Sequence, residues 1–296
     1  MKNFSNKFRN FSGDKKLNFF EKILWLIISY INIKFTGRID KKINYLKFKI
    51  NTKLLNKNNL FKSKSPIRQV CNVFWQSIDW QEIKLKLDNN IKLLEVGCGD
   101  GRYFSFIKKI SKIKKIKYIG IDIQKKKIKR EKNLKFFLDS AYNVNYYLNK
   151  VNFLFTQSAI EHFKYDIIFF NKISKFLNKK KKKFIQIHLF PAESTLYTYL
   201  FHGYRHYNPL MISKLIKSFN ENHKFILFSI GSKNINKFTF REITLRRIFK
   251  KEQINLNIKK LKECIEKDNK IYSLKNSSFY CLVILSNMKM DNILKK

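Results

Sequence analysis

The chain has 296 residues, of which 44% are hydrophobic, so it can bury a sizeable core and is too apolar for wholesale disorder. Its formal net charge is +42. A polyanionic partner (RNA, DNA, an anionic membrane or an acidic glycan) is one interpretation of that charge. The compositional bias of an A/T-rich genome is the other, and it is favoured because Lys, Asn, Ile and Phe crowd every segment.

The four cysteines are far apart in the sequence, at Cys71, Cys98, Cys264 and Cys281. Their spacing excludes a metal knuckle or a redox pair built from neighbouring cysteines, and their low density argues against a disulfide framework. We therefore expect a protein of the reducing cytoplasm.

Residues 1–65 are expected to form a basic, helical N-terminal extension. They contain the apolar run ILWLIISYINI at 23–33, flanked by lysines. The run is shorter than the roughly 20 residues of a spanning helix, and it lacks the cleavage site of a signal peptide. Two interpretations stay open. The helix packs into a core, or it lies on an anionic membrane at the inner face of the plasma membrane, with Trp25 and Tyr30 at the interface.

A second domain is expected over residues 66–296, beginning with a helix from Val70 to Trp80. Short apolar runs then alternate with helical stretches, which is typical of a mostly parallel sheet covered by helices on both faces. We expect seven strands, the last antiparallel, at 91–96, 117–122, 133–138, 152–157, 183–190, 224–230 and 279–286, with helices at about 102–113 and 162–177.

The stretch LLEVGCGDG, residues 93–101, follows the first of these strands with three glycines at alternate positions. Glycines permit a tight turn and a close approach of backbone to a ligand, and the next helix presents free N–H groups there. Asp122, at the end of the next strand, can accept hydrogen bonds from both hydroxyls of a ribose. This combination predicts a site for a nucleoside-containing cofactor.

The charges beside the loop bear on which cofactor binds. A dinucleotide fingerprint reads G-x-G-x-x-G, whereas this chain reads E-x-G-x-G-x-G. Glu95 and Asp100 would repel a pyrophosphate, but they would attract the sulfonium and ammonium groups of S-adenosylmethionine. The pattern therefore favours S-adenosylmethionine.

LLEVGCGDG resembles the first motif of the class I S-adenosylmethionine-dependent methyltransferases, and IGIDI (119–123) resembles the second. LDSAY (138–142) is similar to the third, in which an acid meets the adenine amino group, and FTQSAIEHF (155–163) to the fourth. The resemblance covers about residues 90–190, the expected cofactor-binding half. It implies a Rossmann-like fold and cofactor contacts from Glu95, Gly97, Cys98, Gly99, Gly101, Asp122, Ile123, Asp139, Ser140 and Gln157.

Glu161 and His162 follow the fourth strand, at the sheet edge where ligands bind in open α/β folds. They are the predicted catalytic residues, with His162 as general base towards a substrate hydroxyl. The alternative is a histidine that only pairs with a neighbour at the start of a helix. Some quinone-biosynthesis relatives bind a metal with an acid where this chain has Ser158, so no metal is predicted.

Residues 191–296 are expected to bind the acceptor. The segment 191–209 resembles part of bacterial methyltransferases of lipopolysaccharide and surface-polysaccharide synthesis. Arg205 has a guanidinium fork that suits a carboxylate or phosphate, and aromatic side chains can contact a sugar ring. The alternative is a basic, aromatic surface loop. The predicted acceptor-binding residues are His202, Tyr204, Arg205 and Tyr207.

The sequence thus predicts a methyltransferase acting on a small-molecule, glycan or glycolipid acceptor, by O-methylation in cell-surface polysaccharide synthesis. An RNA methyltransferase is the first alternative, motivated by the charge but supported by no recognisable RNA-binding module. A non-catalytic basic scaffold of the same fold is the second. The intact glycines and Asp122 argue against lost cofactor binding.

Overall fold

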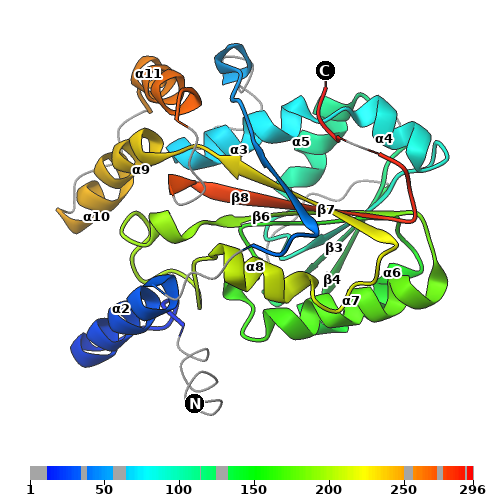
Figure 1. Cartoon of the computed structure of the whole chain (residues 1–296), viewed down its shortest axis with the longest axis horizontal. Helices are drawn as coiled ribbons and strands as arrows, with labels where there is room; N and C mark the ends of the chain where they lie inside the picture. The colour runs from blue at the N-terminus through cyan, green and yellow to red at the C-terminus, as the bar shows by residue number, and fades with distance from the viewer. Residues whose placement is uncertain are drawn as a thin grey trace.

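A twisted sheet runs through the middle of the molecule, with helices on both faces (Figure 1). The computed structural model describes residues 12–34, 39–55, 65–113, 115–124, 133–249, 256–271, 276–290 and 292–295. Within them the sheet has eight strands in the order β1-β7-β8-β6-β5-β2-β3-β4. The strands are β1 (Ile43–Lys47), β2 (Lys92–Val96), β3 (Lys117–Asp122), β4 (Leu134–Leu138), β5 (Phe153–Gln157), β6 (Phe184–Pro191), β7 (His223–Ile230) and β8 (Phe279–Ser286).

All seven predicted strands are present, with ends within one residue of the prediction. β8 pairs antiparallel with both β6 and β7, as expected, and the other pairs are parallel. The predicted number of seven strands is wrong, because β1 adds an eighth that pairs with β7. Only Ile43 of this edge strand is buried, so its sequence lacks the apolar run that marks the other strands. Residues 1–65 therefore contain a strand of the main sheet as well as a helix.

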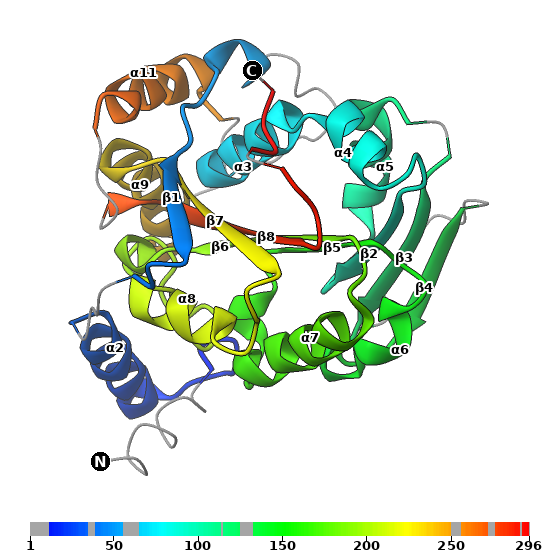
Figure 2. The same ribbon diagram turned by 45° about the vertical axis from the view of Figure 1, so that its right-hand side comes forward.

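Two sets of helices cover the two faces of the sheet and pack against separate core clusters (Figure 2). One face carries α3 (Pro66–Ser77), α4 (Trp80–Lys86), α5 (Arg102–Ser111), α9 (Lys233–Thr239) and α11 (Ile258–Asn269). The other face carries α6 (Asn145–Leu148), α7 (Asp166–Lys180) and α8 (Pro209–Ile216). A π-helical turn, η5 (Phe240–Leu245), joins α9 to α10 (Arg246–Ile248).

The predicted helices differ from the observed ones mainly at their ends. The helix expected at 70–80 is two helices, because Asp79 accepts hydrogen bonds from the N–H groups of Gln81 and Glu82 and so starts α4. The helix expected from residue 162 begins at Asp166, since residues 160–162 form the 3₁₀ turn η3 (Ile160–His162).

The helix α2 (Phe19–Lys34) contains the apolar run and lies at the periphery of the molecule (Figure 1). Trp25 is 1% exposed, packs against Phe201 and His206, and donates a hydrogen bond to the carbonyl of Gly203 at 3.4 Å. Trp25 is therefore a packing residue, and the prediction that it lies at a membrane interface is wrong. Among the described helices, none is long and apolar enough to cross a membrane.

The strand order reverses at β2, which pairs with β3 on one side and with β5 on the other. Because these pairs are parallel, the carboxyl ends of the three strands lie at one edge of the sheet. Open α/β sheets bind ligands at such a switch point. The Gly-rich loop, Asp122 and the segment after β5 are all brought there.

Candidate active site

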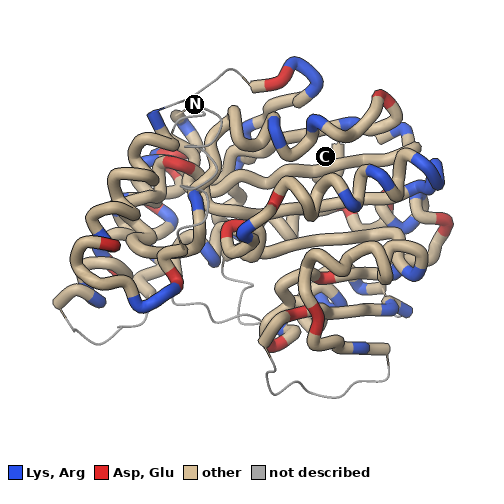
Figure 3. Tube along the Cα trace, turned by 90° about the horizontal axis from the view of Figure 1, so that it is seen from below, with Lys and Arg blue, Asp and Glu red and all other residues tan. Residues whose placement is uncertain are grey.

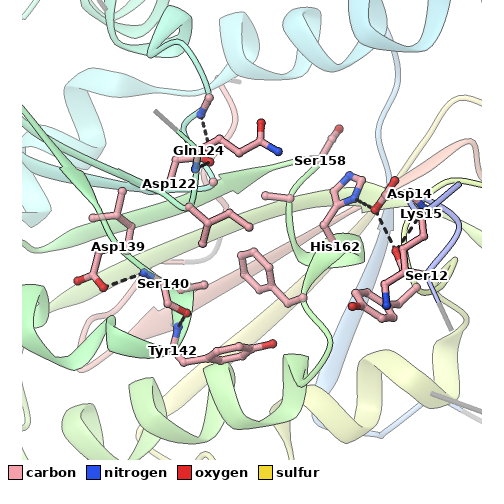
Figure 4. Close-up of a pocket in the computed structure, with 18 residues that line it drawn as sticks. Ser12, Asp14, Lys15, Asp122, Gln124, Asp139, Ser140, Tyr142, Ser158 and His162 are labelled. Atoms are coloured by element: carbon pink, nitrogen blue, oxygen red, sulfur yellow. Dashed lines mark hydrogen bonds and ion pairs between the residues drawn. The ribbon is translucent and has the colours of Figure 1, made fainter. Parts of the chain in front are cut away.

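A cavity of about 640 Å³ opens at this edge of the sheet (Figure 4). Ligand sites for small molecules and cofactors typically fall between about 300 and 1,000 Å³. Of the predicted cofactor-binding residues, those that line the cavity are Gly97, Gly99, Asp122, Ile123, Asp139 and Ser140.

The Gly-rich loop forms one wall of this cavity in the conformation that its glycines permit. Gly97 has a φ of 76°, and a Cβ at this position would lie only 2.5 Å from the Cβ of Ala159. The N–H of Gly99 donates to Oδ2 of Asp122 at 2.8 Å, and the N–H of Gln124 donates to Oδ1 at 2.9 Å. The loop thus holds the Asp122 carboxylate at the cavity, where a ribose can reach it.

Asp139 lies at one end of the cavity, held by its neighbours. Its carboxylate accepts hydrogen bonds from Tyr147, Asn143 and the N–H of Ser140, each at 2.7 Å. Burial raises the pKa of Asp139, but these hydrogen bonds outweigh it and hold the pKa below its ordinary value. With Asp14 and Asp122, the described lining of the cavity has three carboxylates and one lysine, Lys15, which suits a cationic ligand.

Four other predicted cofactor residues are buried and do not line the cavity. Glu95 is 1% exposed and accepts a hydrogen bond from the hydroxyl of Tyr118, and burial raises its pKa well above the ordinary value. The side-chain oxygen of Gln157 accepts a hydrogen bond from Trp75 at 2.9 Å. The remaining two, Cys98 within the loop and Gly101 at the start of α5, are also buried.

His162 lines the opposite end of the cavity and is paired with Asp14 (Figure 4). The carboxylate Oδ2 of Asp14 lies 2.6 Å from Nδ1 of His162. Burial lowers the pKa of His162, but the hydrogen bond to Asp14 and the charges of Glu161 and Asp14 raise it above its ordinary value. Burial also raises the pKa of Asp14, yet the hydrogen bond and charge of His162 bring it down to about 2.

Asp14 reaches the site because the N-terminal segment docks onto residues 201–203. The N–H of Gly13 donates to the carbonyl of Gly203 at 2.7 Å, and the N–H of Gly203 donates to Oδ1 of Asp14 at 3.1 Å. A Cβ at Gly13 would lie 2.4 Å from the backbone of Phe201, so only glycine fits this approach. The sequence prediction missed Asp14, which is 148 residues from His162. The one available signal was a lone acid in a basic stretch.

Glu161 does not line the cavity. It is fully buried, and neither of its carboxylate oxygens has a hydrogen-bond partner in the described part of the chain. Burial raises its pKa to about 7. Its Oε1 lies 3.9 Å from Nε2 of His202, whose ring packs edge-on against the ring of His162 with centroids 4.6 Å apart. Burial and the neighbouring His162 lower the pKa of His202 to about 4.

Asp14, His162 and His202 bring potential metal-ligating atoms within 4.8 Å of one another. Two histidines and a carboxylate are a set that binds divalent transition metals in other proteins. The hydrogen bond between Asp14 and His162 already satisfies one atom of each of these two residues. The absence of a metal stays a prediction.

The predicted acceptor-binding residues separate into two groups. Tyr204 lines the large cavity, and His202 lines a smaller one beside it. Arg205 and Tyr207 instead lie in the protein core. Nη1 of Arg205 is 2.7 Å from the buried Asp166 carboxylate, and its guanidinium also donates to the carbonyls of Phe163 and Lys164. The predicted contact between Arg205 and an acceptor therefore has no support from its position.

Comparison with known proteins agrees with this geometry. A family model described as "Methyltransferase domain" matches residues 87–266, more than half of the chain. The chain belongs to this methyltransferase family. It is an S-adenosylmethionine-dependent enzyme of class I, and S-adenosylmethionine is its cofactor. The glycine loop, Asp122 and the three carboxylates of the large cavity fit that cationic nucleoside.

Solved structures similar to this methyltransferase share little sequence with it. The plantazolicin methyltransferase BamL, in complex with a triazolic desmethylPZN analog and SAH, is 13% identical, with a TM-score of 0.47 and coverage of 96% of this chain and 97% of that chain. A SAM dependent methyltransferase from Archaeoglobus fulgidus is 16% identical, with a TM-score of 0.44 and coverage of 80% and 100%. A putative sarcosine dimethylglycine methyltransferase from Galdieria sulphuraria is 11% identical, with a TM-score of 0.43 and coverage of 70% and 83%. No curated protein matches the sequence. None of these likenesses identifies an acceptor.

Proposed function

We propose that the enzyme methylates a hydroxyl group of a small-molecule or glycan acceptor at the His162 end of the large cavity. The observation that carries the proposal is the Asp14–His162 pair, which lies in the same cavity as the cofactor cradle (Figure 4). In this arrangement Asp122 would hold the ribose and Asp139 would hold the adenine. Ser158 and His162, at the other end of the cavity, would then lie where the acceptor hydroxyl meets the methyl group.

When bound, S-adenosylmethionine supplies an activated methyl group for in-line attack by the acceptor. The protein's task is to position the acceptor hydroxyl and to remove its proton. With its Nδ1–H donating to Asp14, His162 keeps its other ring nitrogen available to accept that proton. The raised pKa of His162 makes it a stronger base than an ordinary histidine.

The acceptor is proposed to be a sugar or glycolipid precursor of a cell-surface polysaccharide. This proposal rests on the resemblance of the 191–209 segment and on two tyrosines, Tyr142 and Tyr204, which line the large cavity and can contact a sugar ring. The test is an untargeted search for methylated products in cell-envelope glycans and in RNA, from cells with and without the protein. A product confined to the glycans is expected, and a product confined to RNA would contradict the proposal.

RNA is the alternative acceptor, motivated by the net charge of +42. In the view of Figure 3, lysines and arginines are spread over many helices and loops rather than gathered in one stripe, which favours a compositional origin of the charge. RNA binding should therefore be non-specific and should collapse with salt. Structure-selective RNA binding that persists at about 0.2 M salt would instead favour the RNA methyltransferase.

We also propose that α2 contacts an anionic membrane surface at the inner face of the plasma membrane. Although Trp25 is buried, α2 leaves large apolar side chains exposed, including Phe20 at 79% and Ile27 at 50%. Exposed lysines precede and follow them, and such a combination suits an anionic bilayer.

The membrane proposal is tested by sedimentation with vesicles that contain anionic or only zwitterionic lipids. The double variant F20S/I27S should lose binding to anionic vesicles while keeping cofactor binding. I168S is the matched control, because Ile168 is similarly exposed at 45% but lies on α7. Equal vesicle binding by the native protein and F20S/I27S would contradict the proposal.

A further inference from the structure

A second cavity, of about 270 Å³, lies beside the large one and has the opposite charge. Among the described residues, its polar lining consists of two arginines, a histidine and three hydroxyl groups, with no carboxylate. These residues are Ser65, Arg68, Ser158, Tyr199, His202 and Arg247. Guanidinium groups and hydroxyls together are the donors that recognise phosphates and carboxylates in proteins.

The charge of Arg68 reaches two buried carboxyls, Glu95 and Glu161, and lowers their pKa values, but burial keeps both pKa values above the ordinary one. Arg68 lies in the first turn of α3 and is half-buried, and Nη1 donates to the hydroxyl of Tyr103 at 3.3 Å. No described carboxylate lies within ion-pair distance of its guanidinium. The start of α3 at this wall adds the positive end of a helix dipole. Placing a cation in such a position is costly unless an anion joins it.

Arg247 differs from the two arginines nearest to it in the sequence. Arg241 and Arg246 both pair with Glu242, at 3.0 and 3.1 Å. Arg247, on α10, lines the second cavity and has no ion-pair partner among the described residues. The fold thus neutralises two arginines of this segment and leaves the third directed to the cavity.

The two cavities meet where the methyl group is expected. Ser158 lines both of them and has a φ of 50°, an uncommon left-handed conformation for a residue other than glycine. His202 lines the second cavity, and its ring contacts that of His162, which lines the first. A ligand held by the arginines therefore reaches the His162 end of the large cavity.

We propose that the second cavity binds an anionic group, a phosphate or a carboxylate, carried by the methyl acceptor. Arg68 and Arg247 hold the anionic group from two sides, and the acceptor hydroxyl lies beside Ser158 and His162. The inference rests on the proposed function, because it takes the methyl transfer to occur at that junction. It assigns to Arg68 and Arg247 the task that the sequence had suggested for Arg205.

The test is a ¹⁵N NMR titration of the full chain that follows the side-chain Nε–Hε signals of the arginines. The signals that disappear in R68Q and in R247Q are assigned to Arg68 and Arg247. Inorganic phosphate and sodium acetate are titrated separately, at an ionic strength kept constant with sodium chloride. The signals of Arg68 and Arg247 should shift with the same dissociation constant for a given anion. The anion that binds more tightly indicates whether the acceptor carries a phosphate or a carboxylate. R247Q should weaken the response of Arg68 about tenfold, the size expected for one charged hydrogen bond.

R241Q is the matched control, because it removes the same charge from the same segment but outside the second cavity. It should leave the response of Arg68 unchanged. Since Arg247 is exposed, R247Q is expected to keep the fold even where R68Q does not. The proposal is overturned if neither anion shifts the Arg68 signal, or if R247Q and R241Q have the same effect.

Calorimetry with S-adenosylhomocysteine separates this inference from the proposed function. Native protein, R68Q and R247Q should all bind it, because the cofactor cavity contains neither arginine. If native protein does not bind S-adenosylhomocysteine, the proposed function fails whatever the anions do. If it binds S-adenosylhomocysteine but the Arg68 signal does not respond to either anion, only the second cavity's assignment fails.

Discussion

The two neighbouring cavities carry opposite charges although the chain as a whole is strongly basic. Among the described residues, the large cavity is lined by Asp14, Asp122 and Asp139 with one lysine, whereas the smaller one is lined by Arg68 and Arg247 with no carboxylate. The chain has 63 basic and only 21 acidic residues, so three carboxylates in one cavity are a marked local departure. The contrast suits a cationic cofactor in one cavity and an anionic acceptor in the other. It also shows that net charge alone is a poor guide to ligands.

The largest expected effect is on the chemistry at the junction of the cavities. H162A should lower kcat by about 10²–10⁴-fold, the usual contribution of a general base, with S-adenosylhomocysteine affinity nearly unchanged. H202A should instead raise the KM for the acceptor, because His202 lines the second cavity. Steady-state kinetics with the acceptor found in the product search measures both. A full kcat in H162A would remove His162 from the mechanism.

Arg205 belongs to neither cavity, and its removal should affect stability. R205A should lower the free energy of unfolding by about 3–5 kcal/mol, because it leaves the buried carboxylate of Asp166 without its partner. R241A, at an exposed arginine, should cost less than about 1 kcal/mol. Urea denaturation followed by circular dichroism compares the two. Similar values for both variants would show that the Arg205–Asp166 pair does not stabilise the core.

The position of the cofactor cavity could be predicted from the sequence. Continuous apolar strands and the glycine pattern depend on local residues, so the seven strands and the place of the loop and Asp122 beside the cavity follow from the sequence, while their contacts with the cofactor stay a prediction. The acceptor side of the site could not be predicted, because it is built from contacts between segments that are distant in the sequence. Asp14 meets His162 across 148 residues, and the second cavity joins the start of α3 to α10. No local pattern distinguishes Arg68, which faces a cavity, from Arg205, which is buried in an ion pair.

A smaller effect is expected on the pH dependence of the His162 end of the large cavity. D14N removes the carboxylate that raises the pKa of His162, so the acid limb of kcat/KM should move to lower pH. His162 can accept a proton only when its ring is neutral, and in D14N the ring stays neutral down to a lower pH. A pH profile of kcat/KM for native protein and D14N tests this. A limb at the same pH in both proteins would contradict the role of Asp14.

The same pair sets the pH range in which the N-terminal segment is held most firmly. Because the pKa of His162 is raised in the folded protein, its pairing with Asp14 stabilises the fold fully below about pH 6.5. This stabilisation is lost as the pH rises through the pKa of His162 in the folded protein. The lowered pKa of Asp14 gives stability that is lost as pH falls from 3.8 towards about 2. Hydrogen exchange of residues 12–18 should therefore be slowest, after correction for intrinsic rates, between about pH 4 and 6.5. D14N should abolish this optimum.

The smallest expected effect is that of a chelator. If Asp14 and His162 act as a hydrogen-bonded pair rather than as metal ligands, EDTA should change kcat by less than about twofold. Loss of activity with EDTA, restored by Zn²⁺ or Mn²⁺, would show that the cluster of Asp14, His162 and His202 holds a metal.

The division of the site into an acidic cofactor cavity and a basic acceptor cavity is tested most directly by one calorimetric experiment. S-adenosylhomocysteine is titrated into native protein, D122A and R247Q. D122A should weaken binding by about 10–100-fold through the loss of the ribose hydrogen bonds, and R247Q should bind like the native protein. Equal affinity in native protein and D122A, or an equal loss in D122A and R247Q, would contradict the division.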